Sequence, residues 1–275
     1  MIEQTVETRV GRLKATVIGD QGPTALLWHS LFVDERSWDR MLPRLAGHRR
    51  LVLVTGPGHG MSTDPGRRYT LRDCAEAAVQ VLDALGVSEP VDWVGNAWGG
   101  HVGLLVAADW PERCRSVAAF GTPIAALTPA EKRRTRLLMG LYRLLGPSPT
   151  IVDGTTEVLL SQRTIERDPD AVALVHDCLR RADRRMLLNA IVSISIRRPD
   201  LAGHLPRVGQ PVLIVTGADH HGFSPEQAQD AVALLARGQL AILPDAAYLV
   251  PLEAPAACAD LVVSLWAGVD LQFRI

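Results

Sequence analysis

The sequence predicts a doubly wound α/β fold, in which helices cover both faces of a mostly parallel sheet. Short apolar runs alternate along the chain with longer amphipathic segments. The runs are apolar at nearly every residue, which is typical of strands buried on both faces. Their alternation with helical patterns is typical of strand–helix–strand units. One long stretch in the middle of the chain breaks the alternation and predicts a helical insertion.

The individual elements follow from the length of each run and from its ends. Residues 4–10 and 12–18 alternate between polar and apolar, and predict an opening antiparallel pair. Strand-length runs rich in Val, Ile and Leu follow at 25–30, 50–56, 91–96, 115–121, 212–217 and 240–245. Helical patterns lie between them, at 35–46, 70–86, 99–109, 225–236 and 254–267. Thr70 is a predicted N-cap, and Gly86 a predicted helix end.

The segment 124–206 contains no convincing strand and several helical stretches. We expect it to lie over one edge of the sheet as a cap. Four arginines of this segment fit the solvated face of amphipathic helices, while a basic wall that faces an anionic ligand is the alternative. These arginines are Arg180, Arg181, Arg184 and Arg185.

Composition and charge exclude several classes of function. The chain has 275 residues, of which 47% are hydrophobic and 21% charged, and its formal net charge is −1. This near-neutral balance gives no indication of nucleic acid or of an anionic membrane as a partner.

The cysteines and the N-terminal sequence suggest a cytoplasmic protein. The four cysteines form no CxxC pair, which favours free thiols in a reducing compartment over a zinc site. The first residues lack the apolar core of a signal peptide. No apolar run reaches the ~20 residues needed to cross a bilayer.

Four motifs, spread over nearly the whole chain, resemble those of the lidded small-molecule branch of the α/β-hydrolase superfamily. That branch includes lactonases, haloalkane dehalogenases, epoxide hydrolases and carbon–carbon bond hydrolases. The resemblance implies a mostly parallel sheet of about eight strands, with a core at 1–123 and 207–275 and a helical cap at 124–206, after the sixth strand. The motifs are LLWHSLFVDERSW (26–38), GPGHGMS (56–62), GNAWGG (95–100) and LPDAAYLVPLEAP (243–255).

GNAWGG is similar to the sharp strand-to-helix turn that presents the nucleophile in this family. Bulky side chains would clash in such a turn, which explains its three glycines. The residue at the tip is Ala97, which carries only a methyl group. The resemblance implies that the backbone amides of Trp98 and Leu31 form an oxyanion hole.

All three positions of the family's catalytic triad depart from its pattern. The nucleophile position holds Ala97, the usual histidine position holds Tyr248, and the usual acid position holds His220, with Asp219 one residue early. An alanine engineered to trap a substrate explains Ala97 alone. The other departures favour natural loss of the nucleophile. A tyrosine, with an ordinary pKa of about 10, is a poor base for serine at neutral pH.

Other side chains offer alternative chemistry. Tyr248, His220 and Asp219 form a candidate acid–base group that needs no covalent step. His29 and Ser30 belong to the predicted oxyanion loop, where Ser30 is a candidate hydrogen-bond donor or a replacement nucleophile. A metal bound by His220, His221 and Asp219 is a remote alternative, because these residues lack the i, i+4 spacing of helical metal ligands. No metal and no cofactor are expected.

Three functions remain open at this stage. The first is an enzyme that carries out elimination, decarboxylation, isomerisation or cyclisation of a carbonyl compound through an enolate. The second is a non-catalytic protein that binds a small ligand under the cap. The third is a hydrolase of esters, lactones or epoxides with substituted or relocated catalytic residues. In each case the expected partner is a small apolar molecule, with a carbonyl or hydroxyl group near Trp98.

Overall fold

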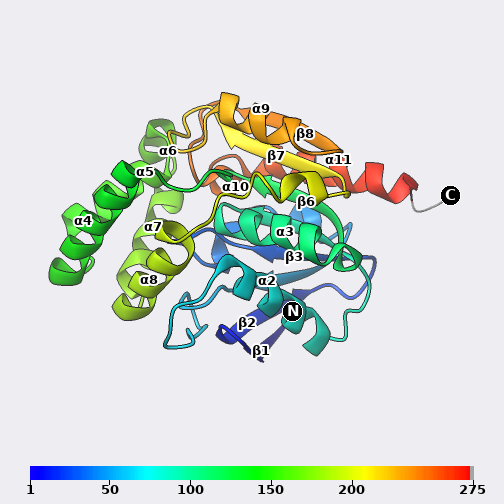
Figure 1. Cartoon of the computed structure of the whole chain (residues 1–275), viewed down its shortest axis with the longest axis horizontal. Helices are drawn as coiled ribbons and strands as arrows, with labels where there is room; N and C mark the ends of the chain where they lie inside the picture. Colours follow the sequence, from blue (N-terminus) through cyan, green and yellow to red (C-terminus); the bar gives the residue numbers. More distant parts are fainter. Residues whose placement is uncertain (273–275) are drawn as a thin grey trace.

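A central eight-stranded sheet organises residues 1–272, which are the residues that the structure, a computed structural model, describes (Figure 1). Its strand order is β1-β2-β4-β3-β5-β6-β7-β8. Strand β2 runs antiparallel to both of its neighbours, and all other neighbouring pairs are parallel, as predicted. The strands are β1 (Ile2–Thr8), β2 (Gly11–Ile18), β3 (Thr24–Trp28), β4 (Arg50–Val54), β5 (Val91–Asn96), β6 (Cys114–Phe120), β7 (Val212–Gly217) and β8 (Gly238–Leu243).

Alternate residues of the central strands belong to two separate hydrophobic clusters. In β3, Leu26 and Trp28 pack into one cluster, and Ala25 and Leu27 pack into the other. Neighbouring residues of a strand point to opposite faces, so both faces of the sheet are covered. This double burial explains why the runs are apolar throughout.

Helices cover the two faces of the sheet. One cluster includes side chains of α2 (Leu71–Ala84), α3 (Trp98–Asp109) and α9 (Pro225–Ala233). The other includes side chains of α1 (Leu42–Leu45), α10 (Val250–Glu253) and α11 (Pro255–Gln272). Thr70 caps α2 through a capping box with Asp73, and Gly86 follows the helix with a positive φ, as predicted.

The helix predicted over 35–46 is wrong. The structure has a 3₁₀ turn, η1 (Glu35–Trp38), followed by a single α-helical turn, α1. Pro43 accounts for the interruption, because proline has no backbone N–H to donate and is tolerated only in the first turn of a helix. Another 3₁₀ turn, η2 (Pro111–Arg113), leads into β6.

The chain between β6 and β7 is helical and contains no strand, in a segment that the structure describes in full. Figure 1 shows its helices grouped at one side of the sheet. Arg180, Arg181, Arg184 and Arg185 are all exposed, which confirms the solvated-face interpretation. The elements are α4 (Pro129–Leu145), α5 (Pro149–Leu159), α6 (Gln162–Arg167), α7 (Pro169–Arg181), α8 (Arg184–Ala190), the π-helical η3 (Ile191–Ile196) and the 3₁₀ turn η4 (Leu205–Arg207).

The cysteines are all free thiols. Cys74, Cys114 and Cys258 are buried, and Cys178 is half-buried. Within residues 1–272 no helix is long and apolar enough to span a bilayer.

Candidate functional site

The turn between β5 and α3 holds a non-glycine residue in a rare backbone conformation. Ala97 has φ 46° and ψ −98°, and α3 begins at the next residue. Its N–H donates to the carbonyl of Phe120 at 2.7 Å, and its carbonyl accepts from the N–H of His101 at 2.9 Å. Non-glycine residues rarely adopt positive φ, and such strain is concentrated at functional sites. Backbone contacts therefore hold the tip of the turn in place.

The glycines around Ala97 allow the close packing that this turn needs. A Cβ atom at Gly95 would lie 2.2 Å from the carbonyl carbon of Gly99, and one at Gly99 would lie 1.8 Å from the carbonyl oxygen of Trp28. At Gly100 it would lie 2.0 Å from the hydroxyl oxygen of Thr122. The steric reason predicted for the glycines of GNAWGG is confirmed.

Two buried backbone amides near this turn donate no hydrogen bond to any described residue. They belong to Trp98, the first residue of α3, and to Leu31, in the loop after β3. The first amides of a helix have no intrahelical acceptor, and they lie at the positive end of the helix dipole. Both residues line the same cavity. Phe32, beside Leu31, also has a positive φ, of 75°.

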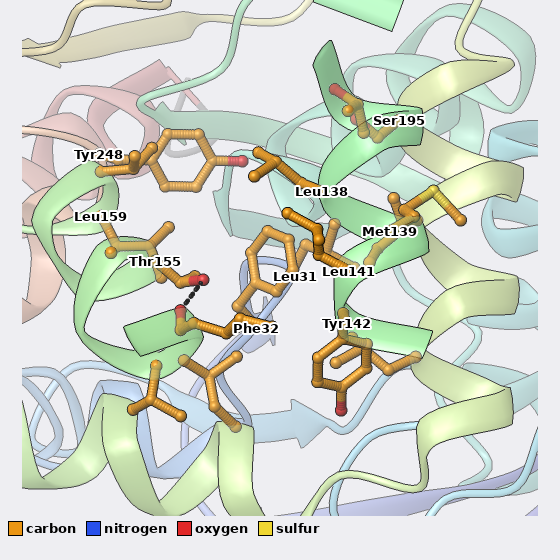
Figure 2. A pocket seen from close by; sticks show the side chains of 18 of the residues that line it. Leu31, Phe32, Leu138, Met139, Leu141, Tyr142, Thr155, Leu159, Ser195 and Tyr248 are labelled. Carbon is orange, nitrogen blue, oxygen red and sulfur yellow. Dashed lines mark hydrogen bonds between the residues drawn. The ribbon is translucent and has the colours of Figure 1, made fainter. Parts of the chain in front are cut away.

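The cavity has a volume of about 460 Å³ and lies between the core and the helices that follow β6. In Figure 2, Leu31, Phe32 and Tyr248 face side chains of α4, and the phenol oxygen of Tyr248 points into the cavity. Most of the lining is apolar, and Ser195 is among its polar side chains. This combination is typical of a small-molecule pocket.

Tyr248 keeps its proton at neutral pH. Burial raises the pKa of its phenol above the ordinary value, and the effects of Ser30 and of the Arg198 charge oppose that rise. The side-chain amide of Asn96 donates to the carbonyls of Tyr248 and Phe120, which ties the Tyr248 loop to the strand ends next to Ala97. Tyr248 can therefore donate a hydrogen bond into the cavity but is a poor proton acceptor.

His220 lies behind Tyr248, and the two ring centroids are 5.0 Å apart. Its Nδ1 accepts a hydrogen bond from the N–H of Gly222 at 3.1 Å, so Nε2 carries the proton. Burial lowers the pKa of His220 to about 4, and the ring is neutral at pH 7. His220 is not among the residues that line the cavity. Asp219 is exposed, and His221 is exposed as well.

His29 has both ring nitrogens occupied. Nδ1 donates to the carbonyl of Ser30 at 2.7 Å, and Nε2 accepts from the N–H of Gly56 at 2.8 Å. The ring thus ties the loop after β3 to the loop after β4. The Ser30 hydroxyl is buried beside the phenol of Tyr248. That phenol is a poor proton acceptor, so it is not a base that could activate Ser30.

Replacing His59 with Asn is expected to make the fold less sensitive to acid. Burial lowers the pKa of His59 to about 3, so the unfolded chain binds this proton at a much higher pH than the folded chain. The stability contributed by the neutral ring is therefore complete above about pH 6.5 and is lost as the pH falls through the range between these two pKa values. Across this range the free energy of unfolding falls by about 1.4 kcal/mol for each pH unit.

Urea unfolding at pH 7, 6 and 5 measures this difference. The Asn side chain can keep the contact that His59 Nδ1 makes with the carbonyl of Pro57 at 3.1 Å. His48→Asn, at an exposed position, is the matched control. If the free energy of unfolding falls equally steeply with acid in His59→Asn and in the unmodified chain, His59 is not a source of the acid sensitivity.

Two residues of the site are missed by reasoning from the sequence. Arg198, after η3, and His101, in α3, are both buried and both line the cavity. The sequence offers little signal for Arg198, because its neighbour Arg197 is of the same type and is exposed. His101 stands out in the sequence only as part of the helix that begins at the turn.

Comparison with known proteins matches residues 25–261, which include all four motifs, to the alpha/beta hydrolase family. A relative described as magnesium-chelatase 30 kDa subunit, from Rhodobacter capsulatus, is 27% identical over 239 residues, which are 82% of each chain. An esterase from Thermogutta terrifontis superposes with a TM-score of 0.89 at 20% identity, covering 98% of this chain and 99% of the other. An enol-lactonase from Burkholderia xenovorans LB400 gives 0.87 at 20% identity, covering 96% and 100%.

Proposed function

Because the chain belongs to the alpha/beta hydrolase family, we propose that it is an enzyme that acts on a small, mostly apolar carbonyl compound without a covalent nucleophile. The observation that carries the proposal is that the turn at Ala97 keeps its backbone shape but lacks a nucleophile. The strained backbone and two unpaired amides are retained, while the tip residue, Ala97, has no reactive group. The fold is shared with an esterase and an enol-lactonase, whose names point to carbonyl substrates.

The proposed chemistry passes through an enolate. The amides of Trp98 and Leu31 stabilise negative charge on the substrate oxygen, because they are fixed donors at a mostly apolar cavity. Tyr248, which stays protonated, donates to the same oxygen or returns a proton to the enolate. Elimination, decarboxylation, isomerisation and cyclisation share this intermediate.

His101 is the candidate proton acceptor on the cavity wall. Its Nε2 lies 2.7 Å from the carbonyl of Pro123 and therefore carries a proton. Its Nδ1 holds the lone pair and has no hydrogen-bond partner among the described residues. Burial lowers the pKa of His101 well below its ordinary value, so the ring enters the reaction neutral. We propose that His220 and Asp219 act on this chemistry only through the position of Tyr248.

A non-catalytic ligand-binding protein is the second candidate. It is favoured by the lack of any hydrogen bond between a nucleophile and a base along the cavity, within the described residues. Retention of one unchanged ligand through purification would support it.

Proton exchange at carbon tests the proposed enzyme before its substrate is known. In D₂O, the protein should exchange the α-protons of at least some ketones, oxo acids or lactones faster than buffer does, as followed by proton NMR. Tyr248→Phe should slow that exchange by about 5- to 13-fold, the effect of losing one hydrogen bond of about 1–1.5 kcal/mol in the transition state.

Tyr69→Phe is the matched control for this exchange, because Tyr69 is a buried tyrosine that does not line the cavity. It should exchange at the rate of the unmodified chain. Equal rates in Tyr248→Phe and in the unmodified chain would remove Tyr248 from the mechanism. An absence of exchange over the whole panel would favour the binding protein.

A further inference from the structure

The cavity wall contains a buried arginine whose charge no acidic side chain balances. Arg198 is 8% exposed and lines the cavity together with Tyr248, His101 and Ser195. It follows the π-helical η3, whose last turn places it through a hydrogen bond from its N–H to the carbonyl of Ser195 at 3.3 Å. Single π turns inside helices are frequent at functional sites.

The guanidinium of Arg198 makes one good hydrogen bond. Its Nη2 donates to the carbonyl of Ala125 at 2.5 Å. Its Nη1 lies 3.4 Å from Nε2 of His101, but that nitrogen carries the proton that it donates to the carbonyl of Pro123. Two N–H donors cannot satisfy each other. The Nε of Arg198 is buried without a partner among the described residues.

No carboxylate of residues 1–272 forms an ion pair with Arg198. The carboxylates of Glu131 and Asp200 act on it only from a distance, and that of Glu131 is itself hydrogen-bonded to Thr128, as the cap of α4. Burial lowers the pKa of Arg198, but an arginine stays charged in proteins. Burying an unpaired cation is unfavourable, which calls for an anion supplied from outside the chain.

We propose that Arg198 binds a carboxylate of the substrate, so that the natural ligand is an apolar molecule with one carboxylate group. A guanidinium donates strong, charge-assisted hydrogen bonds to a carboxylate, and Nη1 of Arg198 has no acceptor among the described residues. A single buried positive charge matches a monoanion better than a phosphate dianion. Arg134 also lines the cavity, but it is exposed to solvent.

The carbonyl end of this substrate rests on the proposed function, since the oxygen is placed by the amides of Trp98 and Leu31. The carboxylate end is inferred from Arg198 alone. The two ends are therefore tested separately, with probes that carry a carboxylate but no ketone, ester or lactone.

Matched straight-chain probes test the carboxylate by calorimetric titration. The probes are the saturated acids from hexanoic to dodecanoic acid, their primary amides and the corresponding alkyl phosphates. The unmodified chain should bind at least one acid about tenfold more tightly than its amide. Arg198→Met should lose that preference and keep the affinity for the amide. Arg197→Met, the exposed neighbour, should keep both.

Three results would overturn the proposal. The first is the absence of any preference for acid over amide in the unmodified chain, including no binding of any acid. The second is a preference that survives in Arg198→Met. The third is tighter binding of an alkyl phosphate than of the acid of equal length. None of these results depends on α-proton exchange, so failure here and failure of the proposed function are distinguishable.

Thermal unfolding separates binding from a structural role. An arginine kept for its ligand destabilises the empty protein, so Arg198→Met should leave Tm unchanged or raise it. An arginine that mainly ties the Ala125 loop to η3 would, when replaced, lower Tm. A lower Tm together with an unchanged preference for the acid would assign Arg198 to the fold.

Discussion

A protein that carries both Ala97→Ser and Tyr248→His is expected to hydrolyse p-nitrophenyl esters about 10²-fold faster than the unmodified chain. The strained turn is held by backbone contacts and by glycines, so a serine at its tip should be presented without rebuilding the site. In a serine protease, an enzyme that keeps serine and histidine but lacks the acid is still about 10²-fold faster than one that lacks the serine. His220, at the acid position, is neutral and cannot replace a carboxylate.

The two single variants are the controls for this gain. Ala97→Ser alone should stay inactive, because the raised pKa of Tyr248 keeps the phenol from accepting the serine proton. Tyr248→His alone lacks a nucleophile. Adding His220→Asp to the double variant should raise the rate again. Esterase activity in the unmodified chain would contradict the absence of a nucleophile from the proposed site. Activity in Ala97→Ser alone would show that a base other than Tyr248 accepts the serine proton.

Gly99→Ala is expected to lower the free energy of unfolding by more than about 4 kcal/mol, which lies at the extreme of single substitutions. The new Cβ would lie 1.8 Å from the carbonyl oxygen of Trp28 and 2.6 Å from its carbonyl carbon. Both atoms are backbone in the central strand β3, so they cannot move aside as a flexible side chain would. The turn at Ala97 and the sheet would have to separate.

Gly140→Ala is the matched control. Gly140 lies inside α4, and a Cβ added there would meet no atom within 4 Å. The substitution should stabilise the protein by up to about 1 kcal/mol, the difference in helix propensity. Chemical unfolding measures both variants. A Gly99→Ala protein within about 1 kcal/mol of the unmodified chain would show that the turn is not packed as tightly as its geometry indicates.

The fold could be predicted from the sequence because its elements are specified locally. Runs such as 212–217 are apolar on both faces, and Thr70 and Gly86 mark helix ends by their chemistry. The 35–46 segment failed because its apolar spacing is helical although Pro43 interrupts the hydrogen bonding. A single backbone constraint outweighed the local pattern there.

The site could be predicted only in part. The turn at Ala97 and the loop of Tyr248 are motifs of consecutive residues, and the structure brings them together through Asn96. Arg198 depends on contacts with Ala125 and His101, which are distant in the sequence. Burial of one arginine of an Arg-Arg pair is set by the path of the chain after η3, which no local pattern encodes.

The way the turn is held has an evolutionary consequence. Since neighbouring glycines and backbone hydrogen bonds preserve the shape around Ala97, no selection on the side chain itself is needed to maintain it. Every alanine codon is one nucleotide from a serine codon, and two of the four are one nucleotide from an aspartate codon. A lineage with this turn can therefore lose its nucleophile, drift under a new function and recover covalent chemistry by point mutation, with the scaffold unchanged throughout.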